Sequence, residues 1–357
     1  MNIRKAPLEI GSTIGIIGDG QLGKMLSMAA SSLGFKTCIY ANSLDSIASQ
    51  VSCSSVVGAH DNFHKLEYFA KNVDIITCET ENIPLSTLDF LADHGKVIYP
   101  DRRAFLVSQN RLLEKQFLSG LQLSTAFIGC AASASDIKKL AHNTPLPWIL
   151  KTTSGGYDGR GQVVLHDVDN AIKTLEEMHY ENHIIEKKLD FAREVSVIIY
   201  RSIDGKIGIY DICENVHENG ILRSTRAGET IKECKAACDI ASRIVEALDY
   251  VGVMGVEFFH DTSNNIIVNE IAPRVHNTGH WTLDACLCSQ FEQHIRMICG
   301  WEAGSTKRLY NIEMTNIIGD EISDWPLLSS MEDTNIYIYG KKDMFPGRKM
   351  GHRTKLV

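Results

Sequence analysis

Short runs of β-branched and apolar residues alternate with amphipathic stretches over the first hundred residues. Runs at 13–17, 37–40, 55–57, 74–77 and 96–99 predict strands, and apolar residues at helical spacing over 22–33 predict a helix after the first run. Strands separated by helices are typical of a parallel sheet that is covered on its faces. The sequence therefore predicts an open α/β domain in this part of the chain.

The pattern changes around residues 100–120, where a charged helix is predicted. Strands at 145–151 and 162–165 flank the glycine-dense segment 155–161, which predicts a hairpin. Runs at 194–200, 207–212, 253–259 and 265–270 predict antiparallel strands, with an amphipathic helix over 231–248. A mixed α+β part is expected to follow the α/β part, and a basic, glycine-containing tail occupies 341–355.

Length and composition indicate a folded chain of two or three domains. The chain has 357 residues and a mass of 39.7 kDa, more than one hydrophobic core usually organises. Its hydrophobic content is 44%, its charged content 22% and its mean hydropathy -0.09. These values exclude a disordered, collagenous or coiled-coil chain.

Charge and cysteine usage narrow the class of partner. A net charge of -8 disfavours nucleic acid and anionic membranes as partners, so an anionic substrate needs a local cationic pocket. The ten cysteines include no Cys-x-x-Cys pair, which predicts free thiols in a reducing cytoplasm and no zinc site. No apolar run reaches membrane-spanning length, so a cytoplasmic location is expected.

Gly18-Asp19-Gly20-Gln21-Leu22-Gly23 fits the pattern G-x-G-x-x-G between a strand and a helix. In that context backbone N–H groups can receive a phosphate. The second strand ends without the acidic residue that grips an adenosine ribose, so NAD is not predicted as a cofactor. A bare tight turn and a site for another ligand both remain open.

A second glycine-rich segment, residues 155–162, surrounds an aromatic ring, a carboxylate and a guanidinium with glycines. Glycines allow close approach to phosphates and loop movement, and Arg160 can bind an anion bidentately. Lys151 precedes this loop at a strand end, where its ammonium could reach a nucleotide phosphate. The alternatives are an ordinary flexible hairpin and a solvated lysine.

Two carboxylates lie on neighbouring predicted strands among apolar residues. Glu257 belongs to the first strand, and Asn269 and Glu270 belong to the second. Unpaired buried carboxylates cost several kcal/mol, so a cation between them is expected, and oxygen ligands suit Mg²⁺. A salt bridge to a basic side chain is the alternative. The segment 272–281, with sequence APRVHNTGHW, follows directly and is interpreted as a substrate wall or as structural histidines.

Together with PGRKMGH at 346–352, these motifs in this order resemble the N5-carboxyaminoimidazole ribonucleotide synthetases of the ATP-grasp superfamily. The resemblance covers nearly the whole chain. It implies an ATP-grasp fold, α/β and α+β, with a Rossmann-like pre-ATP-grasp domain at 1–109. A small lid subdomain would occupy 110–189, and a larger mixed subdomain with a substrate-binding tail would occupy 190–357.

The activity implied by the resemblance is the ATP-dependent carboxylation of aminoimidazole ribonucleotide by bicarbonate, through carboxyphosphate, in purine biosynthesis. Phosphoryl transfer of this kind requires alignment and charge neutralisation by cations and Mg²⁺. The family resemblance also implies a homodimer, with the downstream carboxyl mutase as a transient partner. Another ATP-grasp carboxylate-amine ligase or a formate-dependent relative is the alternative.

The resemblance also implies roles for individual residues. ATP would be bound by Arg111, Lys151, Gly156, Tyr157, Asp158, Gly159, Arg160, Gly161, Gln162, Glu186, Lys187, Lys188, Leu189, Glu194, His217, Asn269 and Glu270. The ribonucleotide would be bound by Gln21, Glu79, Glu81, Tyr157, Arg160, Lys341 and Arg348, and Mg²⁺ by Glu257 and Glu270. Asp158, Arg274, His276 and Asn277 would be catalytic. Departures from the family pattern occur at Asp19, Thr153, Ser154 and Phe345.

Overall fold

The β-branched runs near the start of the chain form a parallel sheet. This computed structural model describes residues 7–155, 161–178, 182–228, 235–263 and 265–357. The strands pair in the order β3-β2-β1-β4, and the pairings are parallel. The elements are β1 (Thr13–Ile17), α1 (Gln21–Ser32), β2 (Lys36–Ala41), η1 (Ala48–Gln50), β3 (Ser54–Val57), α2 (Phe63–Lys71), β4 (Ile75–Cys78), α3 (Leu85–Asp93) and α4 (Arg102–Ser108).

The α/β prediction is confirmed, but the predicted strand at 96–99 is wrong. Ile98 forms only an isolated parallel bridge with Ile76. Pro100 follows closely, and a proline offers no N–H for a ladder and restricts the residue before it. Pairing therefore ends after a single bridge.

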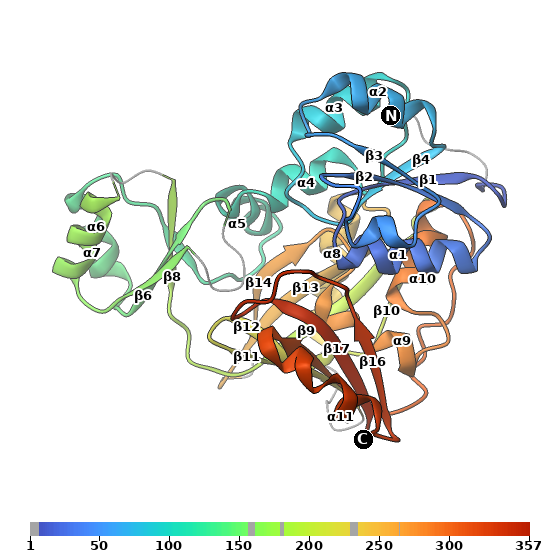
Figure 1. The fold of residues 1–357 in the computed structure, drawn as a ribbon. Coiled ribbons are helices and arrows are strands. Elements are labelled where there is room, and N and C mark those ends of the chain that lie inside the picture. Colours follow the sequence, from blue (N-terminus) through green and yellow to red (C-terminus); the bar gives the residue numbers. More distant parts are fainter. Residues whose placement is uncertain (1–6, 156–160, 179–181, 229–234, 264) are drawn as a thin grey trace.

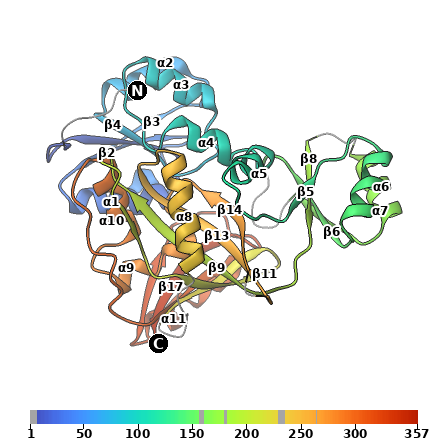
Figure 2. The same cartoon turned by 180° about the vertical axis from the view of Figure 1, so that it is seen from behind.

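Helix α5 (Arg111–Gly120) connects this part to a small antiparallel sheet in the order β5-β8-β6-β7. Its elements are β5 (Phe127–Gly129), α6 (Ala134–Asn143), β6 (Trp148–Thr152), β7 (Gln162–Leu165), α7 (Val168–Glu177) and β8 (His183–Lys187). Trp148, Leu150 and Ile185 share a core with residues of α6 and α7. The predicted hairpin is confirmed by the β6–β7 pairing, although its first strand begins after Pro147. We call this small antiparallel part, residues 127–187, the lid, and Figures 1 and 2 show it projecting to one side, with α5 between it and the rest.

The remaining strands form one large sheet in the order β14-β13-β9-β11-β12-β15-β17-β16, with β10 paired to β9. Its elements are β9 (Phe191–Arg201), β10 (Ile207–Ile209), β11 (Cys213–Glu218), β12 (Ile221–Ala227), α8 (Lys235–Ala247), β13 (Gly252–Asp261), β14 (Ile266–Ala272), η2 (Asn277–Gly279), α9 (Thr282–Ala285), α10 (Gln290–Ile298), β15 (Ile312–Ile318), η3 (Gly319–Asp324), α11 (Trp325–Ser329), β16 (Thr334–Ile338) and β17 (Lys349–Leu356). The predicted strands and helix are confirmed, with the strand at 207–212 shortened. The start of the predicted helix, 231–234, lies outside the described residues.

Alternation along the central strand decides which face of the large sheet is polar. Val195, Val197 and Ile199 pack in one core with α8, which covers one face of the sheet (Figure 2). Ile198 packs instead in the core that contains α10 and α1. Successive side chains of a strand point to opposite faces, so Glu194 lies on the face opposite α8.

The N-terminal part joins the large sheet on that second face. Met25 and Leu26 of α1 share a core with residues of α10. The tail also returns to the N-terminal part, because Lys24 Nζ donates to Tyr339 O over 3.2 Å. Across the described residues, helices long and apolar enough to cross a membrane are absent.

Candidate active site

The glycine-rich turn at residues 18–23 holds a carboxylate of this chain. Gly20 N donates to Glu79 Oε1, and Gly23 N donates to Glu79 Oε2 over 2.5 Å. Gly18 has φ +108, and a Cβ at this position would overlap Glu79 Cγ, so only glycine fits. Burial raises the pKa of Glu79, although the two backbone donors oppose that rise. The N–H groups that a phosphate would need are already engaged, which argues against the dinucleotide interpretation.

Two other polar residues of this turn have separate positions. Asp19 Oδ2 accepts a hydrogen bond from Asn42 N over 2.8 Å, so its carboxylate caps the end of β2. Gln21 is the first residue of α1 and is partly buried. Asp19, one of the residues that depart from the family pattern, therefore has a local structural partner.

An ion pair joins the end of the N-terminal sheet to the segment after β14. Arg274 Nε donates to Glu81 Oε2, and Arg274 Nη2 donates to Glu81 Oε1 over 3.1 Å. Gln109 Nε2 donates to Glu81 O over 2.7 Å and fixes the backbone of this residue. Burial alone would raise the pKa of Glu81, but the Arg274 guanidinium holds it below its usual range. The pair unites a predicted ribonucleotide residue with a predicted catalytic one.

His276 is a buried, neutral side chain beside a predicted metal ligand. Its Nε2 lies 3.5 Å from Glu257 Oε1. Burial, and then the nearby Arg274 charge, lower the pKa of His276 to about 3. The close approach requires Gly255 on β13, since a Cβ there would lie 2.7 Å from His276 Cβ. At neutral pH, His276 can therefore act as a hydrogen-bonding group without carrying charge.

Gln290, at the start of α10, clamps this segment. Its Oε1 accepts from His276 N over 2.8 Å, and its Nε2 donates to His276 O over 2.6 Å. The same Nε2 lies 3.0 Å from His280 Nδ1. Backbone and side chain of the histidine segment are thus fixed by one buried amide.

Asn277 has unsatisfied hydrogen-bonding capacity. Its side-chain oxygen and nitrogen are both buried, and neither finds a partner in the described part of the chain. A buried polar group left unpaired costs about 1–3 kcal/mol. Such a residue is typical of a site where a ligand supplies the missing partner.

The predicted metal carboxylates lie opposite each other on adjacent strands. Glu257 of β13 pairs in register with Glu270 of β14. Glu257 is 9% exposed, and burial together with the Glu270 charge raises its pKa to about 7. A cation between the two carboxylates would relieve this repulsion.

The donor set around these carboxylates is small. Among the described residues, clusters of three or more His, Cys, Asp or Glu side chains that could hold a metal are absent. Two carboxylates still fit Mg²⁺, which commonly completes its shell with phosphate oxygens and water. The cysteines that the structure describes are free thiols.

Glu194 and His217 meet on the same polar face of the sheet. Glu194 Oε2 lies 2.6 Å from His217 Nδ1, and both side chains are partly buried. Burial would lower the pKa of His217, but the Glu194 and Glu257 charges raise it. The structure thus brings together two residues expected to contact the nucleotide.

Lys151 is held by a buried carboxylate on the neighbouring strand. Its Nζ lies 2.5 Å from Glu186 Oε2, while Lys115 Nζ lies 3.4 Å from Glu186 Oε1. Burial would raise the pKa of Glu186, but the two lysines lower it. Arg111 Nη1 donates to Thr152 O over 2.7 Å, beside Lys151. Three predicted ATP residues therefore converge at the base of the lid.

The predicted phosphate loop lies partly outside the described residues. Gly156, Tyr157, Asp158, Gly159 and Arg160 lie outside the described residues. The next two residues of the predicted ATP set, Gly161 and Gln162, are described, and Gln162 pairs with Lys151 across the hairpin. Beyond Glu186 the chain leaves the lid through three further predicted residues, Lys187, Lys188 and Leu189, of which the two lysines are exposed. Gly161 directly precedes β7, and its carbonyl oxygen accepts from Thr152 N over 3.0 Å.

The tail contributes a set of cations. Arg348 Nη1 donates to Asp343 O over 2.7 Å, and its guanidinium lies 4.9 Å from the Phe345 ring centre. Lys341 Nζ lies 5.5 Å from the Tyr339 ring centre. The ring of Phe345, another residue that departs from the family pattern, therefore supports the Arg348 guanidinium.

Sequence reasoning missed Lys115, Gln290 and Lys349. Lys115 lies on the same helix face as Leu118, three residues later, and both are buried. A charged residue at an apolar helical position was the available signal. Lys349 begins β17, and its charge acts on Glu257 and His276.

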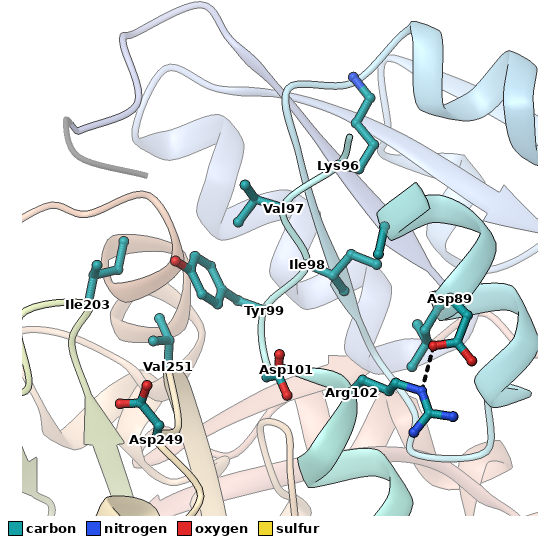
Figure 3. Close-up of a pocket in the computed structure, with 12 residues that line it drawn as sticks. Asp89, Lys96, Val97, Ile98, Tyr99, Asp101, Arg102, Ile203, Asp249 and Val251 are labelled. Atoms are coloured by element: carbon teal, nitrogen blue, oxygen red, sulfur yellow. Dashed lines mark hydrogen bonds and ion pairs between the residues drawn. The ribbon is translucent and has the colours of Figure 1, made fainter. Parts of the chain in front are cut away.

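A cavity of about 170 Å³ lies apart from these residues. It is lined by α3, by the segment 96–102 and by residues near the ends of β9 and β13, where Tyr99 lies toward Ile203 and Val251 (Figure 3). Of the predicted site residues that the structure describes, none lines this cavity.

Family models match most of the chain. A ribonucleotide synthetase preATP-grasp domain matches residues 11–109, an ATP-grasp domain matches 116–291, and a phosphoribosylaminoimidazole carboxylase C-terminal domain matches 313–356. The N5-carboxyaminoimidazole ribonucleotide synthase of Brucella melitensis biotype 1 is 41% identical over 99% of this chain and 98% of that protein. The same-named protein of Bacillus subtilis is 36% identical over 96% of this chain and 91% of that protein.

Solved structures agree with these matches. The ADP complex of an N5-carboxyaminoimidazole ribonucleotide synthetase has a TM-score of 0.93 and 34% identity, covering 99% of this chain and 94% of that one. A synthase from Aspergillus clavatus in complex with ADP and 5-aminoimidazole ribonucleotide has a TM-score of 0.88 and 28% identity, covering 97% and 94%. The fold is that of an ATP-grasp ligase. Within that class, the chain belongs to the N5-carboxyaminoimidazole ribonucleotide synthase family.

The contact between Gly18 and Glu79 gives a first prediction. Gly18→Ala should lower the free energy of unfolding by roughly 1–3 kcal/mol more than Gly11→Ala, because the added methyl overlaps Glu79. Gly11 is a matched control, since its φ is +87 and a Cβ there has open space. Urea unfolding of both variants provides the measurement, and equal losses would show that only backbone strain matters.

Proposed function

We propose that this chain catalyses the ATP-dependent carboxylation of 5-aminoimidazole ribonucleotide, a step of purine biosynthesis. The Glu81–Arg274 pair carries the proposal. It ties the N-terminal strand ends to the segment whose His276 lies against Glu257 on the polar sheet face. One set of contacts thereby joins the expected ribonucleotide side of the site to the expected nucleotide side.

The proposed chemistry has two steps. A bicarbonate oxygen bonds to the γ-phosphorus of ATP, the bond to ADP breaks, and carboxyphosphate forms. The exocyclic amine then bonds to the carboxyl carbon, phosphate leaves with the C–O bond electrons, and the amine loses a proton. Phosphorylation gives bicarbonate a leaving group, and a closed site protects the labile intermediate from water.

On the nucleotide side, Arg111 and Lys151 contact the ATP phosphates, and the loop from Gly156 to Gln162 folds over them. Glu186 and the backbone through Leu189 receive the adenine, while Glu194 accepts from the ribose hydroxyls beside His217. The Glu186–Lys151 pair and the Glu194–His217 pair support this assignment, because each joins two of the proposed ligands.

On the ribonucleotide side, Tyr157, Arg160, Lys341 and Arg348 clamp the 5′-phosphate, and Gln21, Glu79 and Glu81 complete the pocket. Asp158, Arg274, His276 and Asn277 face the imidazole and the carboxyphosphate. The amide of Asn277 is buried without a partner among the described residues, and this amide and the neutral ring of His276 support roles as hydrogen-bonding groups. Asp158 orients the attacking amine.

Glu257 and Glu270, assisted by Asn269, hold Mg²⁺ in this proposal. Bound Mg²⁺ neutralises phosphate charge and helps to align the phosphates for transfer. The elevated pKa of Glu257 and its register with Glu270 support this ligand pair.

The proposal extends to organisation in the cell. Its domains are 1–109, 110–189 and 190–357, and the active form is a cytoplasmic homodimer. The product passes to a carboxyl mutase that makes transient contact. Free cysteines among the described residues are consistent with a reducing compartment.

An ATPase assay tests the reaction. ADP formation should depend on both aminoimidazole ribonucleotide and bicarbonate, and one carboxylated product should form for each ADP. Formate and amino acids should fail to replace bicarbonate, because a related ligase with another carboxylate is the nearest rival. If saturating ribonucleotide or bicarbonate leaves the rate of ADP formation unchanged, the proposed reaction is refuted.

Arg274 gives a sharper test of the site. Arg274→Ala should lower kcat/KM for aminoimidazole ribonucleotide by about 10²-fold or more, because a charge contact to the reacting groups is lost. Arg201→Ala is the matched control. Arg201 also pairs with a carboxylate, Asp249 at 2.6 Å, and donates to a backbone carbonyl, Tyr250 O, at the other end of β9. Similar losses in both variants would contradict a catalytic role.

The carboxylate pair predicts a magnesium phenotype. Glu257→Gln and Glu270→Gln should each raise the Mg²⁺ concentration for half-maximal ADP formation by about 10–100-fold, because each removes a charged oxygen ligand. Glu313→Gln serves as a control on β15, where Glu313 pairs with Arg226. An unchanged Mg²⁺ dependence in the Glu257 and Glu270 variants would move the metal site elsewhere.

A further inference from the structure

Lys115 lies at the centre of a buried charge cluster that links the lid to the large sheet. The residue is 2% exposed and belongs to α5. Its Nζ donates to Asn269 O and lies 3.4 Å from Glu186 Oε1 and 3.5 Å from Glu114 Oε2. One ammonium therefore contacts the lid strand β8 and the strand β14 at once.

The contact of Lys115 with β14 provides a partner for a backbone group at the edge of the large sheet. Among the described strands, β14 is the last in the order of the large sheet, so its outer backbone groups need other partners. Lys115 Nζ binds the carbonyl of Asn269, and Glu114 Oε1 accepts from Ile271 N over 2.8 Å. Neighbouring side chains of α5 thus fix the backbone on both sides of Glu270.

The contact of Lys115 with β8 places a second positive charge beside Glu186. This carboxylate is 2% exposed and lies between Lys115 and Lys151. A buried carboxylate holds a single cationic partner tightly, since water cannot screen the attraction. A second cation shares the charge, so that Lys151 can turn from Glu186 toward an incoming phosphate.

The surrounding charges keep Lys115 protonated. Burial would lower its pKa, but the carboxylates of Glu114, Glu186 and Glu270 raise it. The ammonium is therefore present across the pH range in which the enzyme is assayed. Lys115 itself has no role in the proposed binding of ATP, ribonucleotide or Mg²⁺.

We propose that Lys115 is a positioning residue that balances the charge of Glu186 and fixes the backbone beside Glu270, leaving Lys151 available to the ATP phosphates. The inference rests on the proposed role of Lys151 in ATP binding. Lys115 acts through other groups, so it differs from the residues that touch the reactants.

Lys115→Met tests the inference with a side chain of similar length and no charge. Its Kd for ADP should rise by about 10-fold or more, because Lys151 then stays paired with Glu186. Its Kd for adenosine, which carries no phosphate, should change less than about 3-fold, since Lys151 has no phosphate to meet. Calorimetry for ADP and ligand-observed NMR for adenosine provide the two values.

Lys96→Met is the matched control. Lys96 Nζ donates to a backbone carbonyl, Val73 O, over 2.7 Å in the N-terminal part, so this variant also loses one ammonium–carbonyl bond. Both Kd values should match those of the unmodified chain. If Lys115→Met weakens ADP and adenosine equally, or weakens neither, the inference is wrong.

Two further variants protect the test against loss of folding. Lys115→Gln retains a donor for Asn269 O without the charge, and it should reproduce the selective loss of ADP affinity. In a Glu186→Gln background, Lys115→Met should alter ADP affinity by less than about 2-fold, because the charge to be balanced is gone. A full additional loss in that background would overturn the inference.

The same measurements separate this inference from the proposed reaction. ADP affinity is measured without ribonucleotide or bicarbonate, so it tests Lys115 whichever carboxylate is the substrate. Failure of the ribonucleotide-dependent assay in the unmodified chain would refute the proposed reaction and leave the ADP comparison valid.

Discussion

Buried carboxylates need compensating donors, and in this acidic chain the compensation connects elements that are distant in sequence. Glu79 receives two backbone N–H groups from the start of α1, and Glu81 receives the guanidinium of Arg274. Glu186 lies between two lysines from α5 and β6. An uncompensated carboxylate in these positions would cost several kcal/mol. The Glu81–Arg274 pair therefore also joins the N-terminal part to the large sheet, and Lys115 joins the lid to the large sheet.

The glycine-rich turn illustrates how compensation changes the meaning of a motif. The spacing at 18–23 is that of a dinucleotide site, and the strand–turn–helix context is present. The anion at the start of α1 is nevertheless Glu79, supplied by the residue that follows β4. The motif predicts that backbone N–H groups are available to an anion. Which anion they bind depends here on Glu79, a residue about 60 positions away.

Local patterns in the sequence predicted much of the fold, and tertiary contacts account for what they did not predict. β-branched and apolar runs located β1, β2 and the long strands β9 and β13, because each run has the length and composition of a buried strand. The run at 96–99 has the same composition, but Pro100 limits it to a bridge at Ile98. Glu81 and Arg274 were predicted as separate site residues, and their direct pairing depends on the fold. The sequence placed Lys115 on a charged helix. Its burial could not be predicted there, because its buried partners come from β8 and β14. The roles of Gly156 to Arg160 stay predictions.

Glu257 is the case in which compensation is incomplete. His276 lies 3.5 Å away but is neutral near pH 7, and Glu270 on the adjacent strand adds a like charge. Burial and the Glu270 charge therefore raise the pKa of Glu257 well above its usual range, which means that the ionised form is costly on this face. Lys349 acts in the opposite direction, but its charge does not cancel the combined effect of burial and Glu270. A nucleotide triphosphate would add further negative charge to this face, and an accompanying cation would reduce the repulsion between its phosphates and Glu257. The same excess of negative charge would favour filling the proposed metal site together with the proposed nucleotide site.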